Sequence, residues 1–221
     1  NAKRLDDKGA GVCGMPALPR VARAALHYGE EPCISGKNGT GAIFFSGCSL
    51  KCCFCQNYPI SHENKGETIS TDRLVDIMKE LEEKQVHTID FVNPTHFSHI
   101  LIDALSKYKP SVPVVYNSSG YDNVETLKHL EGLVDVFLPD LKYFSSEKSQ
   151  KYAKCPDYFE KTSEAAYSVW TAVVTALISG VILLFTFRKS PIKLNAKAVL
   201  SMAGNGVLNR VANYLLLLSL A

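Results

Sequence analysis

The chain has 221 residues, of which 46% are hydrophobic and 21% are charged, and its formal net charge is +2 at pH 7. This length predicts one globular domain with an appendage. A charge so near neutral, without a long basic run, excludes a protein that binds nucleic acid through a strong positive field.

Residues 1–40 are predicted to form an N-terminal extension. The chain begins at Asn1, without an initiator methionine and without an apolar signal segment. We therefore expect the sequence to be a fragment whose natural N-terminus lies further upstream.

Residues 41–155 switch repeatedly between the hydrophobic period of a strand and that of a helix, which predicts βα units and a parallel sheet. The expected strands are residues 41–45, 87–92, 114–117 and 134–138. The expected helices are residues 71–84, 96–107, 123–130 and 145–154. The predicted fold class is therefore α/β, a partial β/α barrel of about four βα units over residues 41–164, with its ligands at the C-terminal ends of the strands.

Three cysteines directly follow the first expected strand. Cys48, Cys52 and Cys55 form a C-x3-C-x2-C triplet. Three thiolates so close together can each bind one iron of a [4Fe-4S] cluster and leave the fourth iron without a protein ligand, open to chemistry. The spacing therefore predicts a cluster with a vacant iron.

Other uses of cysteine fit the triplet less well. A structural zinc site usually has four ligands, often as two C-x2-C pairs, and Cys13, Cys33 and Cys155 each stand alone in the sequence. A disulfide framework is typical of small secreted chains, and an ordinary ferredoxin cluster requires a fourth cysteine at a set spacing. Cys53 lies at the wrong spacing for a ligand and is expected to pack against the barrel.

The triplet and its surroundings resemble a known enzyme superfamily. An aromatic residue, Phe54, precedes the last cysteine of the triplet, as it does in radical S-adenosylmethionine enzymes. The pyruvate formate-lyase activating enzyme-like branch is similar in residues 27–36, 44–48, 55–58, 93–96, 115–121 and 138–143. The resemblance covers about residues 10–165.

This resemblance implies a radical S-adenosylmethionine barrel with a [4Fe-4S] cluster and S-adenosylmethionine as cofactors. The implied reaction is reductive cleavage of S-adenosylmethionine to methionine and a 5'-deoxyadenosyl radical. By analogy with activating enzymes, the radical takes hydrogen from a glycine of a protein substrate, a glycyl radical enzyme, and the electron comes from flavodoxin or ferredoxin. A non-catalytic iron-sulfur or metal-binding module is the alternative, and no nucleic-acid partner is expected.

Candidate cofactor-binding residues follow the ends of the expected strands. They are Asn93, Thr95, His96, Asn117, Ser118, Asp140 and Lys142. The resemblance implies that the loop at residues 93–96 binds the amino group of S-adenosylmethionine. It also implies that Asp140 helps to hold a monovalent cation beside the methionine carboxylate, and that Lys142 contacts substrate or cofactor. No residue is assigned as catalytic.

Each of these candidates also has a structural interpretation. Thr95 is suited to cap a helix, and His96 to lie in its first turn. Asn117 and Ser118 are equally suited to form a turn beside Gly120. A surface ion pair is the alternative for residues 140 and 142.

The chain changes character at residue 165. Residues 165–187 are 23 residues without a charge, enough for a membrane-spanning helix, with a buried barrel helix as the alternative. A second apolar stretch, residues 198–221, contains Arg210 as its only charge. The two stretches resemble, in composition, part of a drug/metabolite transporter-type membrane protein. A membrane-anchored or transporter-fragment protein, with residues 165–221 as its membrane segment, is therefore the third functional hypothesis.

The two parts of the chain predict different surroundings. A reducible iron-sulfur cluster belongs in the cytoplasm, and the chain is expected at a membrane if residues 165–221 form spans. The basic residues after the first stretch favour a cytoplasmic loop there, which conflicts with a cytoplasmic cluster domain on the other side of one span. Radical enzymes of this kind have more βα units than the four that this sequence predicts. The conflict predicts a truncated or chimeric chain that binds a cluster poorly and cleaves S-adenosylmethionine slowly or not at all.

Overall fold

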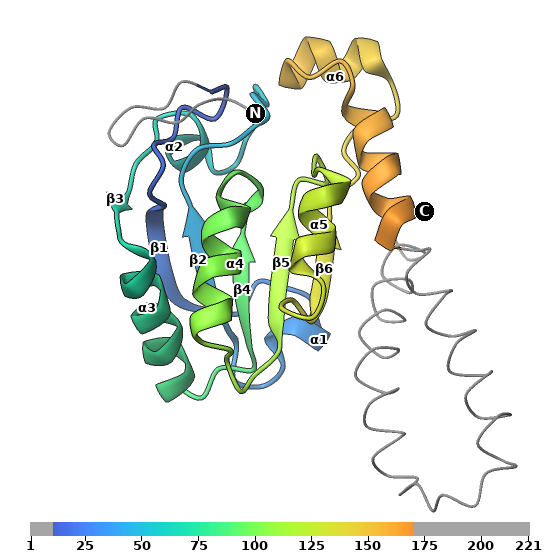
Figure 1. Cartoon of the computed structure of the whole chain (residues 1–221). Coiled ribbons are helices and arrows are strands. Elements are labelled where there is room, and N and C mark those ends of the chain that lie inside the picture. The colour runs from blue at the N-terminus through green and yellow to red at the C-terminus, as the bar shows by residue number, and fades with distance from the viewer. Residues whose placement is uncertain (1–10, 170–221) are drawn as a thin grey trace, which may run out of the picture.

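The structure of the chain is a computed structural model that describes residues 11–169. One mixed sheet forms its centre, with the strand order β3-β1-β2-β4-β5-β6 (Figure 1). The strands are β1 (Arg20–His27), β2 (Thr40–Phe45), β3 (Glu67–Thr68), β4 (Thr88–Val92), β5 (Val114–Ser118) and β6 (Val136–Pro139). β2, β4, β5 and β6 run parallel, whereas β1 pairs antiparallel with both β2 and β3.

Three helices cover one face of this sheet (Figure 1). They are α3 (Thr71–Glu83), α4 (Ser98–Lys107) and α5 (Val124–Leu130). The shorter elements are α1 (Pro32–Ser35), α2 (Tyr58–Ser61), the 3-10 turn η1 (Thr95–Phe97) and α6 (Ser146–Ala153). A further helix covers residues 158–169.

The sequence of α3 shows why these helices form and where they pack. Its buried side chains include Leu74, Met78 and Leu81, whose helical spacing makes one apolar stripe. The Ser70 hydroxyl accepts a hydrogen bond from the Arg73 N–H at 3.1 Å and so caps the first turn. The stripe buries against the sheet.

The two faces of the sheet differ in chemistry. The face toward the helices carries the large apolar side chains of the main core, among them Phe45, Phe91 and Tyr116. Alternate residues of the same strands point to the other face, which we call the inner face. It carries a small cluster around Val115 and Leu138, and also the buried polar residues Thr88 and Asp90. The inner face is therefore only partly apolar.

The expected α/β fold with four parallel strands is confirmed, and each strand boundary lies within two residues of its predicted position. The antiparallel strand β1 was not anticipated. It lies within residues 1–40, so the sheet begins inside the region that was expected to be an N-terminal extension. Its side chains are mostly half-buried, because the neighbouring β3 spans only two residues, and this blurs the alternation typical of strands.

The expected membrane segment begins inside the described chain and continues beyond it. Ala165, its first residue, is buried in the main core, and Val169 packs against that core. Residues 170–221, with the remainder of the first stretch and all of the second, lie outside the described residues. Within residues 11–169, no helix has the length and apolar character needed to cross a membrane.

Candidate functional site

The cysteine loop begins directly after β2, at Gly47. The backbone of Gly47 has φ +79°, which favours glycine. A Cβ atom at this position would lie 2.4 Å from the Cγ of Met15 and 2.8 Å from the backbone oxygen of Cys13. Residues 13–15 therefore press against the start of the loop, and only glycine allows the chain to turn there into Cys48.

Two predicted site residues hold the backbone of this loop. The Asn93 side chain donates its Nδ2 hydrogen to the Gly47 carbonyl at 2.7 Å. The buried His96 ring donates from Nε2 to the Ser46 carbonyl, also at 2.7 Å. Both residues therefore fix the position at which the cysteines leave the sheet. A direct contact of either with S-adenosylmethionine stays a prediction.

The end of α6 holds the middle of the loop. The Lys51 N–H donates to the Ala153 carbonyl, and the Cys53 N–H donates to the Tyr152 carbonyl, both at 2.9 Å. The prediction that Cys53 packs against the barrel is wrong, because its side chain is exposed. Cys53 and Phe54 form a turn, across which the Cys55 N–H donates to the Cys52 carbonyl at 3.3 Å. Both turn side chains are exposed, whereas Cys52 before the turn is buried.

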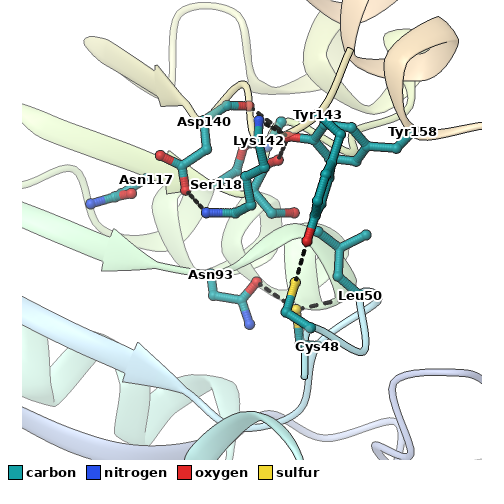
Figure 2. A network of polar contacts seen from close by, with 12 residues as sticks. Cys48, Leu50, Asn93, Asn117, Ser118, Asp140, Lys142, Tyr143 and Tyr158 are labelled. Atoms are coloured by element: carbon teal, nitrogen blue, oxygen red, sulfur yellow. Dashed lines mark hydrogen bonds and ion pairs between the residues drawn. The ribbon is translucent and has the colours of Figure 1, made fainter. Parts of the chain in front are cut away.

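Each thiol of the triplet accepts a hydrogen bond, and the three donors come from different parts of the chain. The pairs are the Leu50 N–H with Cys48 at 3.4 Å, the Ser61 hydroxyl with Cys55 at 3.1 Å and the Tyr143 hydroxyl with Cys52 at 3.9 Å. Figure 2 shows the Tyr143 hydroxyl pointing at a sulfur atom and the contact between Leu50 and Cys48. Such donors stabilise thiolates and orient them as metal ligands.

The electrostatics show that the three thiols lie close together. Burial raises the pKa of Cys48, and the neighbouring Cys52 and Cys55 raise it further. Burial also raises the pKa of Cys52, whereas the Tyr143 hydrogen bond and the positive charge of Lys142 lower it. A bound cation would have to offset the cost of three thiolates that are buried or partly buried.

A [4Fe-4S] cluster fits this donor set. In the described part of the chain, no three His, Cys, Asp or Glu side chains are placed to coordinate one metal ion. A cubic cluster does not require three side chains to converge on one metal ion, because each thiolate binds a different iron. The triplet packs against a buried group of Leu50, Tyr143, Tyr158 and Cys155, which shields it from water. Cys48, Cys52 and Cys55 are therefore the residues that would hold the cluster.

The donors to Cys55 and Cys52 are expected to tune the reduction potential of the bound cluster. Ser61→Ala and Tyr143→Phe should each make the potential more negative, because hydrogen bonds to ligand sulfurs stabilise the electron-rich reduced state. A redox titration of the reconstituted proteins measures this. Tyr152→Phe alters a nearby exposed ring and is the matched control. Equal potentials in all these proteins would contradict the assignment.

Asp140 and Lys142 lie beside the cysteine loop. They form an ion pair with each other, and both are part of the network in Figure 2. The hydroxyl of Tyr158 accepts from the Lys142 N–H at 3.0 Å and is 2.7 Å from the Ser119 carbonyl, which accepts its hydrogen. Tyr158 therefore fixes the turn after β6. The side chains of residues 140 and 142 remain partly exposed, at 54% and 34%.

Asn117 connects the cysteine loop with two acidic side chains on the inner face. Its backbone oxygen accepts from the Asn93 N–H at 2.7 Å. Its side-chain amide donates to Oδ2 of Asp90 at 3.3 Å and to Oε2 of Glu30 at 3.4 Å. The predicted site residue Asn117 thus faces carboxyl groups rather than the triplet.

Thr95 and Ser118 are not brought together with the cysteines. Both donate to the buried carboxylate of Asp122, at 2.8 Å and 2.5 Å, and the Tyr116 hydroxyl donates to it at 2.9 Å. Burial raises the pKa of Asp122, and the three hydroxyl donors act in the opposite direction. This group joins the loops after β4 and β5. The contacts are structural, and a role in cofactor binding stays a prediction for both residues.

Several residues at the site were missed from the sequence. Ser61 and Tyr143 follow Cys55 and Lys142 closely, but nothing in their spacing points to a sulfur atom. Asp90 does carry a signal, because an acidic residue in the middle of a buried apolar strand is costly unless it has a partner or a function. Glu30 lies far away in the sequence and carries no such signal.

Comparisons with known proteins agree with this site. The sequence profile described as "Radical SAM superfamily" matches residues 42–181, which include the whole cysteine loop. An uncharacterized protein of Methanocaldococcus jannaschii is 34% identical over 143 residues, which are 61% of this chain and 41% of that protein. The chain therefore spans less than half of the length of this curated relative. Since the profile covers more than half of the sequence and includes the cysteine triplet, the chain belongs to the radical SAM superfamily.

Proposed function

We propose that the chain is part of a radical S-adenosylmethionine enzyme of the pyruvate formate-lyase activating enzyme-like branch. The observation that carries the proposal is the arrangement of three thiols on one loop at the C-terminal end of β2, each with its own hydrogen-bond donor. Cys48, Cys52 and Cys55 would hold a [4Fe-4S] cluster there, and this group would supply the electron for cleavage of S-adenosylmethionine into methionine and a 5'-deoxyadenosyl radical. In this branch the proposed hydrogen donor is a glycine of a protein substrate.

The protein's own residues hold and orient the reactants. Asn93 and His96 keep the loop in place through the Gly47 and Ser46 carbonyls. Lys142 lies near Cys52, and its positive charge favours the Cys52 thiolate that would bind the cluster. Its partner, the half-exposed Asp140, is the proposed contact of the cofactor's carboxylate region, through a monovalent cation.

The surface beside the loop supports an acidic electron donor, such as flavodoxin or ferredoxin. Phe54 is 61% exposed, and its ring centroid lies 6.5 Å from that of Tyr152. Three exposed lysines follow at helical spacing along α6 and just after it: Lys148, Lys151 and Lys154. An exposed aromatic group with positive charges around it is complementary to an acidic partner and speeds its association.

The proposal is tested by the products of S-adenosylmethionine cleavage. The full chain is reconstituted with iron and sulfide without oxygen, reduced and given S-adenosylmethionine. Formation of 5'-deoxyadenosine that is lost in Cys55→Ala supports the proposal. A reduced cluster that forms no 5'-deoxyadenosine and whose electron paramagnetic resonance spectrum S-adenosylmethionine leaves unchanged would instead identify an electron-transfer module. A changed spectrum without product is the result expected of a truncated barrel. Transfer of deuterium into 5'-deoxyadenosine from a peptide with an α-deuterated glycine tests the glycine step.

A further inference from the structure

The inner face of the sheet holds two carboxyl groups that share one amide. Asp90 on β4 is fully buried, and Glu30, in the loop before α1, has a side chain that is 17% exposed. The Asn117 amide donates to both, at 3.3 Å and 3.4 Å. The other oxygen of Asp90, Oδ1, is buried and has no hydrogen-bond partner within residues 11–169. One acceptor at the centre of this group is therefore left open.

This acidic pair also lacks a matching positive charge. Among the ion pairs of the described chain, a His27 nitrogen at 3.8 Å is the basic group near Glu30, and no pair involves Asp90. Glu31 and Asp140 add negative charge to the neighbourhood of Glu30. Lys142, a neighbour of the cysteine loop, is paired with Asp140. Buried carboxylates in this situation hold a proton or bind a cation, because an isolated charge is too costly away from water.

The form of the group favours a cation that donates hydrogen bonds. The free oxygen of Asp90, the Glu30 carboxylate and the amide oxygen of Asn117 are all acceptors, and they come from three separate segments. A protonated amine or a guanidinium group offers several N–H donors at once.

We infer that Glu30, Asp90 and Asn117 form a subsite for a protonated amine or guanidinium group of the substrate. The inference rests on the proposed function, because the subsite adjoins the cysteine loop. Asn117 lies on the inner face, and its backbone holds Asn93, which in turn holds Gly47 and lies beside Cys48. Glu30, whose side chain is 17% exposed, is the member of the group that a substrate would meet first.

Burial of Asp90 is consistent with this role. Burial raises its pKa to about 8, and the charges of Glu30 and Glu31 act in the same direction, whereas the Asn117 hydrogen bond lowers it. The carboxyl is then protonated at neutral pH when the subsite is empty. A cation that enters would displace this proton, so binding should release protons to the buffer.

Thermal unfolding of the full chain without a cluster tests the subsite by itself. The probes are butylammonium, butyltrimethylammonium and potassium chlorides at equal ionic strength. The first probe donates N–H hydrogen bonds, the second has the same charge without such donors, and the third controls for salt. We expect butylammonium to raise the melting temperature above that in the other two salts. The rise should be lost in Asp90→Asn and Glu30→Gln and kept in Asp103→Asn, a carboxylate on the exposed side of α4.

Several results would overturn the inference. The same rise with butyltrimethylammonium or potassium would show that charge alone acts. The same rise in Asp90→Asn would place the binding elsewhere. A rise with S-adenosylmethionine that depends on Asp90 would assign the subsite to the cofactor instead of the substrate. Because the assay needs no cluster, specific binding of butylammonium together with absent 5'-deoxyadenosine formation would contradict the proposed function alone.

Discussion

Alanine at any one of Cys48, Cys52 and Cys55 is expected to abolish assembly of the cluster. Each thiol would supply the single protein ligand of one iron, so a variant that lacks one thiol leaves a second iron without a protein ligand. Anaerobic reconstitution followed by measurement of bound iron and sulfide, and of visible absorption, gives the result directly.

Cys53→Ala is the matched control for these variants. Cys53 lies in the same loop, between two of the ligands, but its side chain is exposed. The Cys53→Ala variant should take up as much iron and sulfide as the wild-type chain. Equal uptake by Cys52→Ala, or loss of uptake in Cys53→Ala, would show that the ligands are assigned incorrectly.

Asp90→Asn is expected to change how the stability of the protein depends on pH. In the folded chain, burial raises the pKa of Asp90 from 3.8 to about 8. The folded state therefore keeps a proton that the unfolded state has released. The proton on Asp90 therefore stabilises the folded state fully when the pH is below 3.8, the ordinary pKa of the group. This stabilisation is lost as the pH rises from there to about 8, at about 1.4 kcal/mol per pH unit for a single group. Asparagine does not titrate, so the free energy of unfolding of the Asp90→Asn variant should rise relative to that of wild type as the pH increases across this interval.

Urea denaturation at a series of pH values measures this difference. Glu30, whose pKa burial also raises, titrates in the same direction in both proteins, so the comparison isolates Asp90. Asp103→Asn, on the exposed side of α4, should follow the wild-type curve in shape. Parallel curves for wild type and Asp90→Asn would mean that the carboxyl of Asp90 is ionised in the folded protein at neutral pH.

The parallel part of the fold could be predicted because its strands are buried on both faces. Residues 88–92 and 114–118 read as short apolar runs between helical periods, and the structure places both in the middle of the sheet. The start of α3 was likewise legible, since Ser70 stands before a clear helical stripe. The triplet could be recognised because its three cysteines are neighbours in sequence.

The remainder of the site depends on contacts between distant segments. Glu30 and Asn117 are 87 positions apart, and Tyr143 and Cys52 are 91 apart, so no local spacing records their proximity. Thr95 and Ser118 were expected to face a ligand, but the buried Asp122 between their loops takes both hydroxyl groups. An acidic residue buried by the fold can redirect polar side chains in a way that a one-dimensional pattern does not show.

The most direct test of the central claim is the electron paramagnetic resonance spectrum of the reduced, reconstituted chain with and without S-adenosylmethionine. If Cys48, Cys52 and Cys55 hold a cluster whose fourth iron is open, the cofactor binds that iron and changes the spectrum. We expect a clear change with S-adenosylmethionine. A reduced cluster whose spectrum is the same with and without the cofactor would contradict the account.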